Sequence, residues 1–246
     1  MRGLPVAPLL RLQTVSKSYG SLVVTNKLDL ELYPREALGV IGPNGAGKST
    51  MFNLVTGDVR PDAGRIFFGE TDVTAMPPHE RCRRGIGRSY QIPHPFTNMT
   101  VFENLLVGAC FGTGRSEAQV TDDCAEILER TGLLPKANMP AGKLSLLERK
   151  RLELARALAT QPKALLLDEI AGGLTEAECQ DLVATIRAIH GAGTAIIWIE
   201  HVVHALLSVV ERLVVINFGA KLDEGDPQTV FNSPQVQEIY MGISAE

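Results

Sequence analysis

Glycines, a lysine and two hydroxyl residues between positions 42 and 50 have the spacing of a phosphate-binding loop. The segment reads GPNGAGKST and fits the pattern G-x-x-x-x-G-K-[ST]. Glycines let the backbone curve so that its N–H groups point inward at a phosphate chain. We expect Lys48 to reach the β- and γ-phosphates and take part in catalysis, and the Ser49 hydroxyl to ligate Mg²⁺. The residues expected to surround the nucleotide phosphates are Gly42, Pro43, Asn44, Gly45, Ala46, Gly47, Lys48, Ser49 and Thr50.

A second apolar segment, ALLLDE, ends in two acidic residues that could serve the same site. Asp168 would hold Mg²⁺, directly or through water, and Glu169 would polarise the water that attacks the γ-phosphate. In isolation, two acids at the end of a strand are typical of a solvated loop. Because a phosphate loop lies upstream, we favour the functional interpretation: a nucleotide is bound and hydrolysed.

The elements that must position these residues follow from the hydrophobic periodicity. An apolar run at 36–42 precedes the loop and helical spacing follows it at 48–57, which gives the strand–loop–helix order that the motif requires. From residue 163 onward, apolar strands alternate with helical segments, as in a parallel sheet with crossover helices. Residues 77–158 have a helical character, and residues 9–32 indicate short strands and turns.

We therefore predict an α/β fold: a phosphate-loop NTPase core, in which helices flank a parallel sheet, with an antiparallel β subdomain and an inserted α-helical subdomain. The whole chain, 1–246, forms one ATPase domain in this interpretation. Residues 1–90 and 159–246 form the core and the β subdomain, and residues 91–158 form approximately the helical subdomain.

Composition narrows the class of protein further. The chain has 246 residues, is 45% hydrophobic and 21% charged, and carries a net charge of −4, so it can bury a core and lacks the basic footprint of a nucleic-acid-binding protein. Four cysteines without C-x-x-C spacing indicate reduced, structural thiols. We expect no signal peptide, because the N-terminal segment MRGLPVAPLLRLQTV has no long apolar stretch followed by a small-residue cleavage site. We expect no membrane span, because charged residues interrupt the most apolar region, 194–219. Any role at a membrane would then require a partner.

The order of further motifs resembles the ATP-binding-cassette ATPases along nearly the whole chain. RSYQIP follows the phosphate loop, KLSLLERKRLELARAL precedes LLLDE, and TAIIWIEH ends a later apolar strand. The resemblance implies a head-to-tail dimer that sandwiches two ATP molecules, each between one subunit's phosphate loop and the other's signature helix. It also implies roles for single residues. Tyr19 matches the aromatic that stacks on adenine, Gln91 the glutamine that senses Mg²⁺ and the attacking water, and His201 the histidine that contacts the γ-phosphate.

Two positions depart from this family's pattern. The signature begins with Leu144 and Ser145 but has leucines at 146 and 147, where the family carries glycine. Ser145 and Glu148 have the spacing of a capping box, so the segment still offers a helix N-terminus and a hydroxyl. Our hypothesis is that Ser145 binds phosphate in trans with looser geometry; the alternatives are a helix cap alone, or an uneven pair with a standard signature on the other subunit. At Thr175 the family has an acidic residue or asparagine, which puts its cross-interface contact in doubt.

Several stretches resemble the ATPase subunits of importers for branched-chain amino acids and related amides or urea, among them GIGRSYQIPHPFTNMTVFENLLVGA and LLLDEIAGGLTEAE. This resemblance implies integral-membrane permease subunits, a second ATPase subunit, a soluble binding protein, and a cytoplasmic position on the inner face of the membrane. Lipid or lipopolysaccharide exporters, a non-hydrolysing regulator, and cassette proteins of DNA repair or translation are the alternatives.

Two surface features carry weaker predictions. We expect some of four apolar residues after Gln91 to line a groove that receives a helix of the membrane subunit; the alternative is that they are core residues. A short basic run is expected to be a solvated face, with contact to lipid head groups or the membrane subunit as the second choice. The apolar residues are Phe96, Met99, Val101 and Phe102, and the basic ones are Arg81, Arg83, Arg84 and Arg88.

Overall fold

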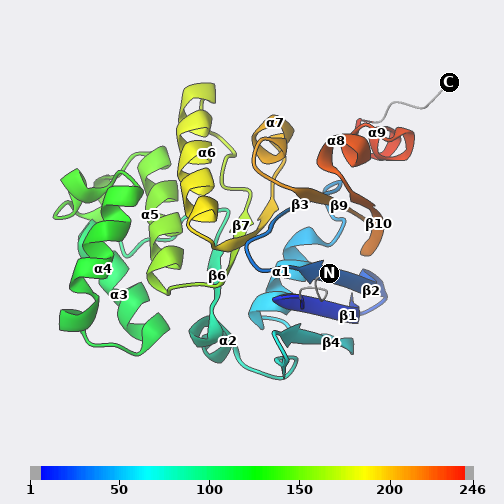
Figure 1. The fold of residues 1–246 in the computed structure, drawn as a ribbon, viewed down its shortest axis with the longest axis horizontal. Helices are drawn as coiled ribbons and strands as arrows, with labels where there is room; N and C mark the ends of the chain where they lie inside the picture. The colour runs from blue at the N-terminus through cyan, green and yellow to red at the C-terminus, as the bar shows by residue number, and fades with distance from the viewer. Residues whose placement is uncertain (1–6, 242–246) are drawn as a thin grey trace, which may run out of the picture.

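The computed structural model describes residues 7–241, and the first residues of the segment inspected for a signal peptide lie outside this range. An antiparallel sheet begins the fold, with the strand order β2-β1-β4-β5 (Figure 1). Its members are β1 Leu10–Tyr19, β2 Leu22–Leu32, β4 Ala63–Phe68 and β5 Thr71–Asp72. One face of β1 and β2 is buried against the helix that follows the phosphate loop, so this sheet helps to hold that helix.

A second sheet of six strands forms the centre of the molecule, in the order β10-β9-β3-β8-β7-β6. The strands from β9 to β6 are parallel, and β10 pairs with β9 in the antiparallel sense. Because β3, β7 and β8 are fully buried, their sequences are almost continuously apolar. The strands are β3 Ala37–Ile41, β6 Ile86–Ser89, β7 Ala164–Asp168, β8 Ala195–Ile199, β9 Arg212–Asn217 and β10 Ala220–Gly225.

Helices lie on both faces of the central sheet, and three of them pack together at one side of the molecule (Figure 1). These three are α3 Val101–Thr113, α4 Glu117–Arg130 and α5 Leu146–Ala159, with short 3₁₀ helices at Leu134–Lys136 and Ala141–Lys143. The other helices are α1 Lys48–Thr56, α2 Pro78–Arg84, α6 Glu176–Gly191, α7 Val203–Leu207, α8 Pro227–Phe231 and α9 Pro234–Met241.

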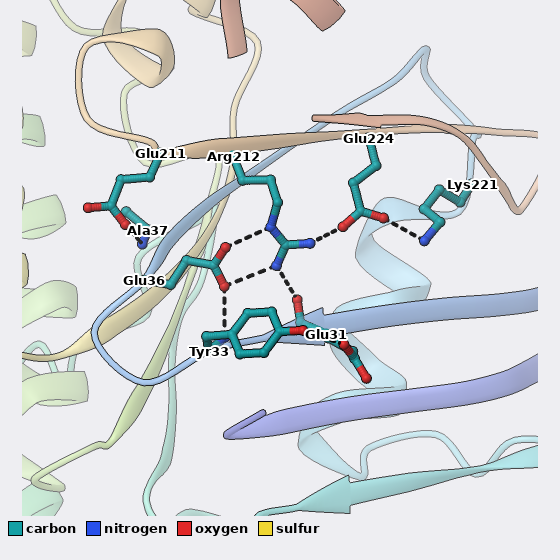
Figure 2. Close-up of polar contacts among 8 residues, drawn as sticks. All are labelled: Glu31, Tyr33, Glu36, Ala37, Glu211, Arg212, Lys221 and Glu224. Atoms are coloured by element: carbon teal, nitrogen blue, oxygen red, sulfur yellow. Dashed lines mark hydrogen bonds and ion pairs between the residues drawn. The ribbon is translucent and has the colours of Figure 1, made fainter. Parts of the chain in front are cut away.

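An arginine at the start of β9 ties the two sheets together (Figure 2). The Arg212 guanidinium donates to both carboxylate oxygens of Glu36, over 2.7 and 3.0 Å, and to the carbonyl of Glu31 at the end of β2, over 2.6 Å. Its remaining terminal nitrogen pairs with Glu224 on β10. Figure 2 shows these groups converging on one guanidinium, so the antiparallel sheet has a fixed position on the core.

Three details of the predicted elements need correction. β1 and β2 form one long hairpin rather than short strands, because irregular positions with positive φ, Thr14 and Lys27, are accommodated as breaks in register without ending the pairing. The helical character predicted from residue 77 onward is interrupted by β6. The segment HVVHALLSVVER predicts a helix over 201–212, but α7 spans only Val203–Leu207, and the Glu200 carboxylate accepts the N–H groups of His201 and Val202 ahead of it.

The basic run is only partly a solvated face. Arg83 and Arg84 are exposed, as predicted, but Arg81 is 1% exposed and the side chain of Arg88 is 7% exposed. Arg81 is buried because its guanidinium donates to four backbone carbonyls, two of them at the carboxyl end of α1. The prediction was wrong for these two residues because charge alone does not reveal a buried set of acceptors.

Candidate functional site

The phosphate-loop motif connects the end of β3 to the start of α1, as the sequence predicted. Gly47 has φ +99°, and a Cβ built there would lie 2.2 Å from the carbonyl oxygen of Val24, so only glycine fits. A cavity of about 270 Å³ lies against the loop. It is lined by Asn44 to Thr50, by Leu22 and Val24 of β2, and by Glu169.

Lys48 places a cation at the base of this cavity. Its ammonium group donates to the carbonyl oxygens of Gly42, over 2.7 Å, and Pro43, over 3.0 Å, and the residue is 5% exposed. Burial lowers the pKa of Lys48, while the carboxylates of Glu169 and Asp168 raise it. A positive charge held among loop N–H groups suits the oxygens of a di- or triphosphate.

Asp168 ends β7 beside this site and is 4% exposed. Its Oδ2 accepts a hydrogen bond of 2.7 Å from Arg88, whereas its buried Oδ1 has no hydrogen-bond partner among the described residues. Burial raises the pKa of Asp168, and the adjacent guanidinium of Arg88 opposes that shift.

The donor set fits a magnesium ion that is bound together with a nucleotide. Mg²⁺ typically takes one or two protein oxygens and completes its shell with phosphate oxygens and water. The unpartnered Oδ1 of Asp168 and the exposed Ser49 hydroxyl, in the first turn of α1, are such oxygens. Within residues 7–241 no group of three or more His, Cys, Asp or Glu side chains could hold a metal by itself.

Glu169 contacts two other residues that were predicted to be catalytic, Gln91 and His201. Its Oε2 accepts a 2.5 Å hydrogen bond from Nε2 of Gln91, and its Oε1 lies 2.8 Å from Nε2 of His201. The backbone of Glu169 has φ +47°, a conformation that is costly for a residue with a side chain and that is common at functional sites. Glu169 also lines the phosphate-loop cavity.

The predicted capping box at the start of α5 is confirmed. The N–H of Glu148 donates to the Ser145 hydroxyl over 3.4 Å, and the N–H of Ser145 donates to the Glu148 carboxylate over 2.9 Å. Ser145 is not among the described residues that line the phosphate-loop cavity. A second cavity of about 300 Å³ separates Leu146 of this helix from Glu169 and His201 of the same chain.

Tyr19 and Thr175 do not line the phosphate-loop cavity. Tyr19, at the end of β1, is half-exposed; it does not line the phosphate-loop cavity, although Leu22 and Val24 on the next strand do. The Thr175 hydroxyl donates to the Glu178 carboxylate over 2.8 Å and accepts that residue's N–H over 3.4 Å. It is therefore engaged as the N-cap of α6.

Two buried charged residues that contact the site were missed by the sequence analysis. Glu200, 1% exposed, accepts the N–H of Ala171 over 2.9 Å and that of His201 over 3.0 Å, and so connects the loops that follow β7 and β8. Its position directly after the apolar strand AIIWI could have indicated that this glutamate is buried. Lys150 of α5 donates to the carbonyl of Ile170 over 2.9 Å, and nothing in its helical surroundings predicted this contact.

The four apolar residues predicted to line a groove for the membrane subunit differ in exposure. Val101 is fully buried and Phe96 is 45% exposed. A cleft of about 300 Å³ does lie between α2, α3, α5 and β6, but none of the four apolar residues proposed for the groove lines it. Its lining includes Asp58, Arg88, Tyr90, Glu153 and Arg156. Val101 is therefore a core residue, and the docking of a membrane helix beside the exposed Phe96 stays a prediction.

Comparisons with known proteins agree with this geometry. Residues 25–172 match the family described as ABC transporter. The chain is 37% identical to the high-affinity branched-chain amino acid transport ATP-binding protein LivG of Escherichia coli (strain K12), over 96% of this chain and 98% of LivG. It is 34% identical to the lipopolysaccharide export system ATP-binding protein LptB of Acidithiobacillus ferridurans, with the same shares covered.

A solved structure, the ADP conformation of an ATP-binding cassette of an ABC transporter, superposes with a TM-score of 0.87 at 30% identity, over 96% of this chain and 99% of that one. None of the helices in residues 7–241 combines the length and the apolar character needed to span a membrane. The family match covers more than half of the chain, and the relatives extend along nearly its whole length. This chain therefore belongs to the ABC transporter family.

Proposed function

We propose that this protein is the ATP-binding and ATP-hydrolysing subunit of a multi-subunit importer for branched-chain amino acids or related small amino acids and amides. One observation carries the hydrolytic part: Glu169 contacts Gln91 and His201 while it lines the cavity of the phosphate loop. The choice of substrate class rests on the similarity to LivG.

ATP would be held chiefly by its phosphates. Residues Gly42 to Thr50 would wrap the phosphate chain, Lys48 would neutralise the β- and γ-phosphates, and Tyr19 would stack on adenine. Asp168 and Ser49 would hold Mg²⁺, which when bound screens the phosphate charge and orients the γ-phosphate. Glu169 would accept a proton from the attacking water, with Gln91 and His201 fixing its carboxylate.

A second ATPase subunit, of the same or a different kind, would complete each site. Because Ser145 lies outside the phosphate-loop cavity of its own chain, it would contact the γ-phosphate bound by the other subunit. ATP would then join the two subunits, and its hydrolysis would release them. The local cap made by the Thr175 hydroxyl argues for a reduced role of this residue across the interface.

The membrane would be reached through integral permease subunits, with a soluble binding protein delivering the substrate on the opposite side. In this arrangement the protein works in the cytoplasm on the inner face of the membrane. Residues 91–158 are taken as the helical subdomain, and the charged cleft beside α2 and α5 offers the permease a recessed contact surface.

The proposal is tested by purifying the tagged chain from its native membranes, identifying its partners by mass, and reconstituting the complex in liposomes. Permeases and a binding protein should co-purify, and leucine bound to that protein should stimulate ATP hydrolysis and enter the liposomes. An ATPase partnered by membrane proteins and stimulated by lipopolysaccharide or lipid instead would establish the exporter alternative, which the similarity to LptB supports. A complex that binds ATP without hydrolysing it would contradict the enzymatic role.

A further inference from the structure

Arg88 joins the two elements that carry the proposed magnesium ligands. One terminal nitrogen of its guanidinium donates to Oδ2 of Asp168 over 2.7 Å. The other donates to Oδ1 of Asn53 over 2.6 Å, and Asn53 lies on α1, the helix whose first turn holds Ser49. The same nitrogen lies 3.7 Å from a carboxylate oxygen of Asp58. One planar group therefore links the end of β7 to α1.

Two aromatic rings hold this guanidinium in place. Its central carbon lies 4.7 Å from the centre of the Tyr90 ring and 5.4 Å from that of Phe52. The side chain is 7% exposed, so few alternative conformations are open to it. Arginine suits such a site better than lysine, because its planar fork can stack on rings while it donates in two directions.

The consequence appears at the carboxylate of Asp168. A carboxylate has two oxygens, and here the guanidinium donates to one while the other, which is buried, has no hydrogen-bond partner among the described residues. An oxygen buried without a partner is costly, and binding a cation removes that cost. Groups that orient the ligands of a metal in this way set its affinity.

We propose that Arg88 is a positioning residue for Mg²⁺: it holds Oδ2 of Asp168 so that Oδ1 stays available to bind the ion, and it fixes Asp168 relative to the helix that carries Ser49. The inference rests on the proposed binding of MgATP. An opposing physical effect exists, since a positive charge next to a metal ligand also repels a divalent cation. The two effects predict opposite signs when the charge is removed, which makes the proposal decidable.

The experiment uses the full chain in a Glu169→Gln background, so that ATP persists. Calorimetry measures ATP affinity at increasing Mg²⁺ concentrations and in EDTA, and electron paramagnetic resonance of Mn²⁺ reports the ligands of the ion. The variants are Arg88→Met, Arg88→Lys, and Tyr90→Ala, which removes one ring of the stack. Arg84→Met removes a positive charge from the exposed part of the same basic run and is the matched control.

We expect Arg88→Met to lower the affinity of the ATP complex for the divalent ion by ~10- to ~100-fold, the range for loss of a group that hydrogen-bonds to a metal ligand. ATP affinity in EDTA should not change. Arg88→Lys and Tyr90→Ala should cause smaller losses in the same direction, and the Mn²⁺ spectrum should change in Arg88→Met only. Equal or tighter ion binding in Arg88→Met would overturn the proposal. If Arg88→Met does not fold, Arg88→Lys and Tyr90→Ala decide: parental ion affinity in both overturns it. A parent that binds no MgATP would instead overturn the proposed function, and this role with it.

Discussion

Oε1 of Glu169 lies 2.8 Å from Nε2 of His201, although the two residues follow different strands. The contact arises because β7 and β8 are parallel neighbours, so that the segments leaving their carboxyl ends meet at one edge of the sheet. The N–H of Glu169 continues the pairing by donating to the carbonyl of Ile199 over 2.8 Å. The backbone therefore fixes the carboxylate beside both the histidine and the phosphate loop.

Substituting Glu169 by glutamine should separate binding from hydrolysis. Glutamine preserves the shape and can still bond to Gln91, but it cannot take a proton from water. We expect ATP affinity to be retained and turnover to fall by ~10²- to ~10⁴-fold, the range for loss of a general base. Phosphate release and calorimetric ATP titration measure the two quantities.

The matched control is Glu176→Gln, an exposed glutamate in the first turn of α6 whose carboxylate lies 3.4 Å from His204. It should hydrolyse ATP at the parental rate. Normal turnover by Glu169→Gln would show that another group activates the water.

Ser145→Ala tests whether the variant signature contacts phosphate. Loss of an N-cap should cost about 1 kcal/mol of stability in the isolated chain. A hydrogen bond to a charged group contributes about 1.5–3 kcal/mol, so turnover by the reconstituted complex should also fall by ~10- to ~100-fold if the hydroxyl binds phosphate in trans. Chemical denaturation and ATPase assays separate the two effects.

Leu147→Gly complements this test, because it restores glycine where the family carries it. If phosphate approaches the backbone closely here, the substitution should accelerate turnover despite a cost to the helix of about 1 kcal/mol. A Ser145→Ala complex that loses stability but turns over ATP normally would leave the residue as a helix cap only.

The sequence predicts those parts of this site that depend only on the spacing of residues close together along the chain. Glycines from 42 to 47 and the lysine that follows must stand in a fixed order for a loop to wrap phosphate, and the capping box needs only two residues three apart. Buried apolar runs likewise located β3, β7 and β8. The strand ends of a parallel sheet then brought Glu169 and His201 together without further information.

The missed parts depend on partners distant in sequence. Arg88 was grouped with its basic neighbours because its acceptors, Asn53 and Asp168, come from other elements. Arg81 was placed in solvent for the same reason, since two of its four acceptor carbonyls, those of Leu54 and Val55, lie in α1, far from Arg81 in the sequence. Pairing in space decides whether a charge can be buried, and a single sequence does not specify it.

Arg81→Met should destabilise the whole fold. Burial lowers the pKa of Arg81 to about 10, so the group remains a cation at neutral pH, and Gly57 leaves room for it, since a Cβ there would lie 2.8 Å from its Nε. Methionine would fill the space but strand the carbonyls of Leu54, Val55, Thr74 and Met76. We expect a loss of at least about 3 kcal/mol in the free energy of unfolding, measured by denaturant titration, against no more than about 0.5 kcal/mol for the exposed Arg84→Met. Equal losses in the two variants would contradict the role assigned to the buried cation.

Glu153 gives the protein a pH dependence whose sign is fixed by its burial. Its carboxylate lies in the charged cleft, 6% exposed, and accepts a 3.0 Å hydrogen bond from Arg156. Burial raises the pKa of Glu153 above its ordinary value of 4.5, and the ion pair with Arg156 only partly offsets this shift. The folded state then binds the proton more tightly than the unfolded state does. The contribution of Glu153 to stability therefore rises as the pH falls through the raised pKa, and this gain is complete below 4.5, the ordinary value.

Glu153→Gln removes this titration while keeping the size of the side chain. We expect the melting temperature of the parent, measured relative to that of Glu153→Gln, to increase as the buffer is changed from neutral pH towards the ordinary carboxyl range. Glu129→Gln, on the exposed face of α4, is the control and should give a difference that does not share this trend. Scanning calorimetry of the three proteins across the same buffers measures it. A parent that loses stability relative to Glu153→Gln on acidification would mean that the ion pair with Arg156 outweighs burial, because only a carboxylate stabilised in the folded state gives that sign.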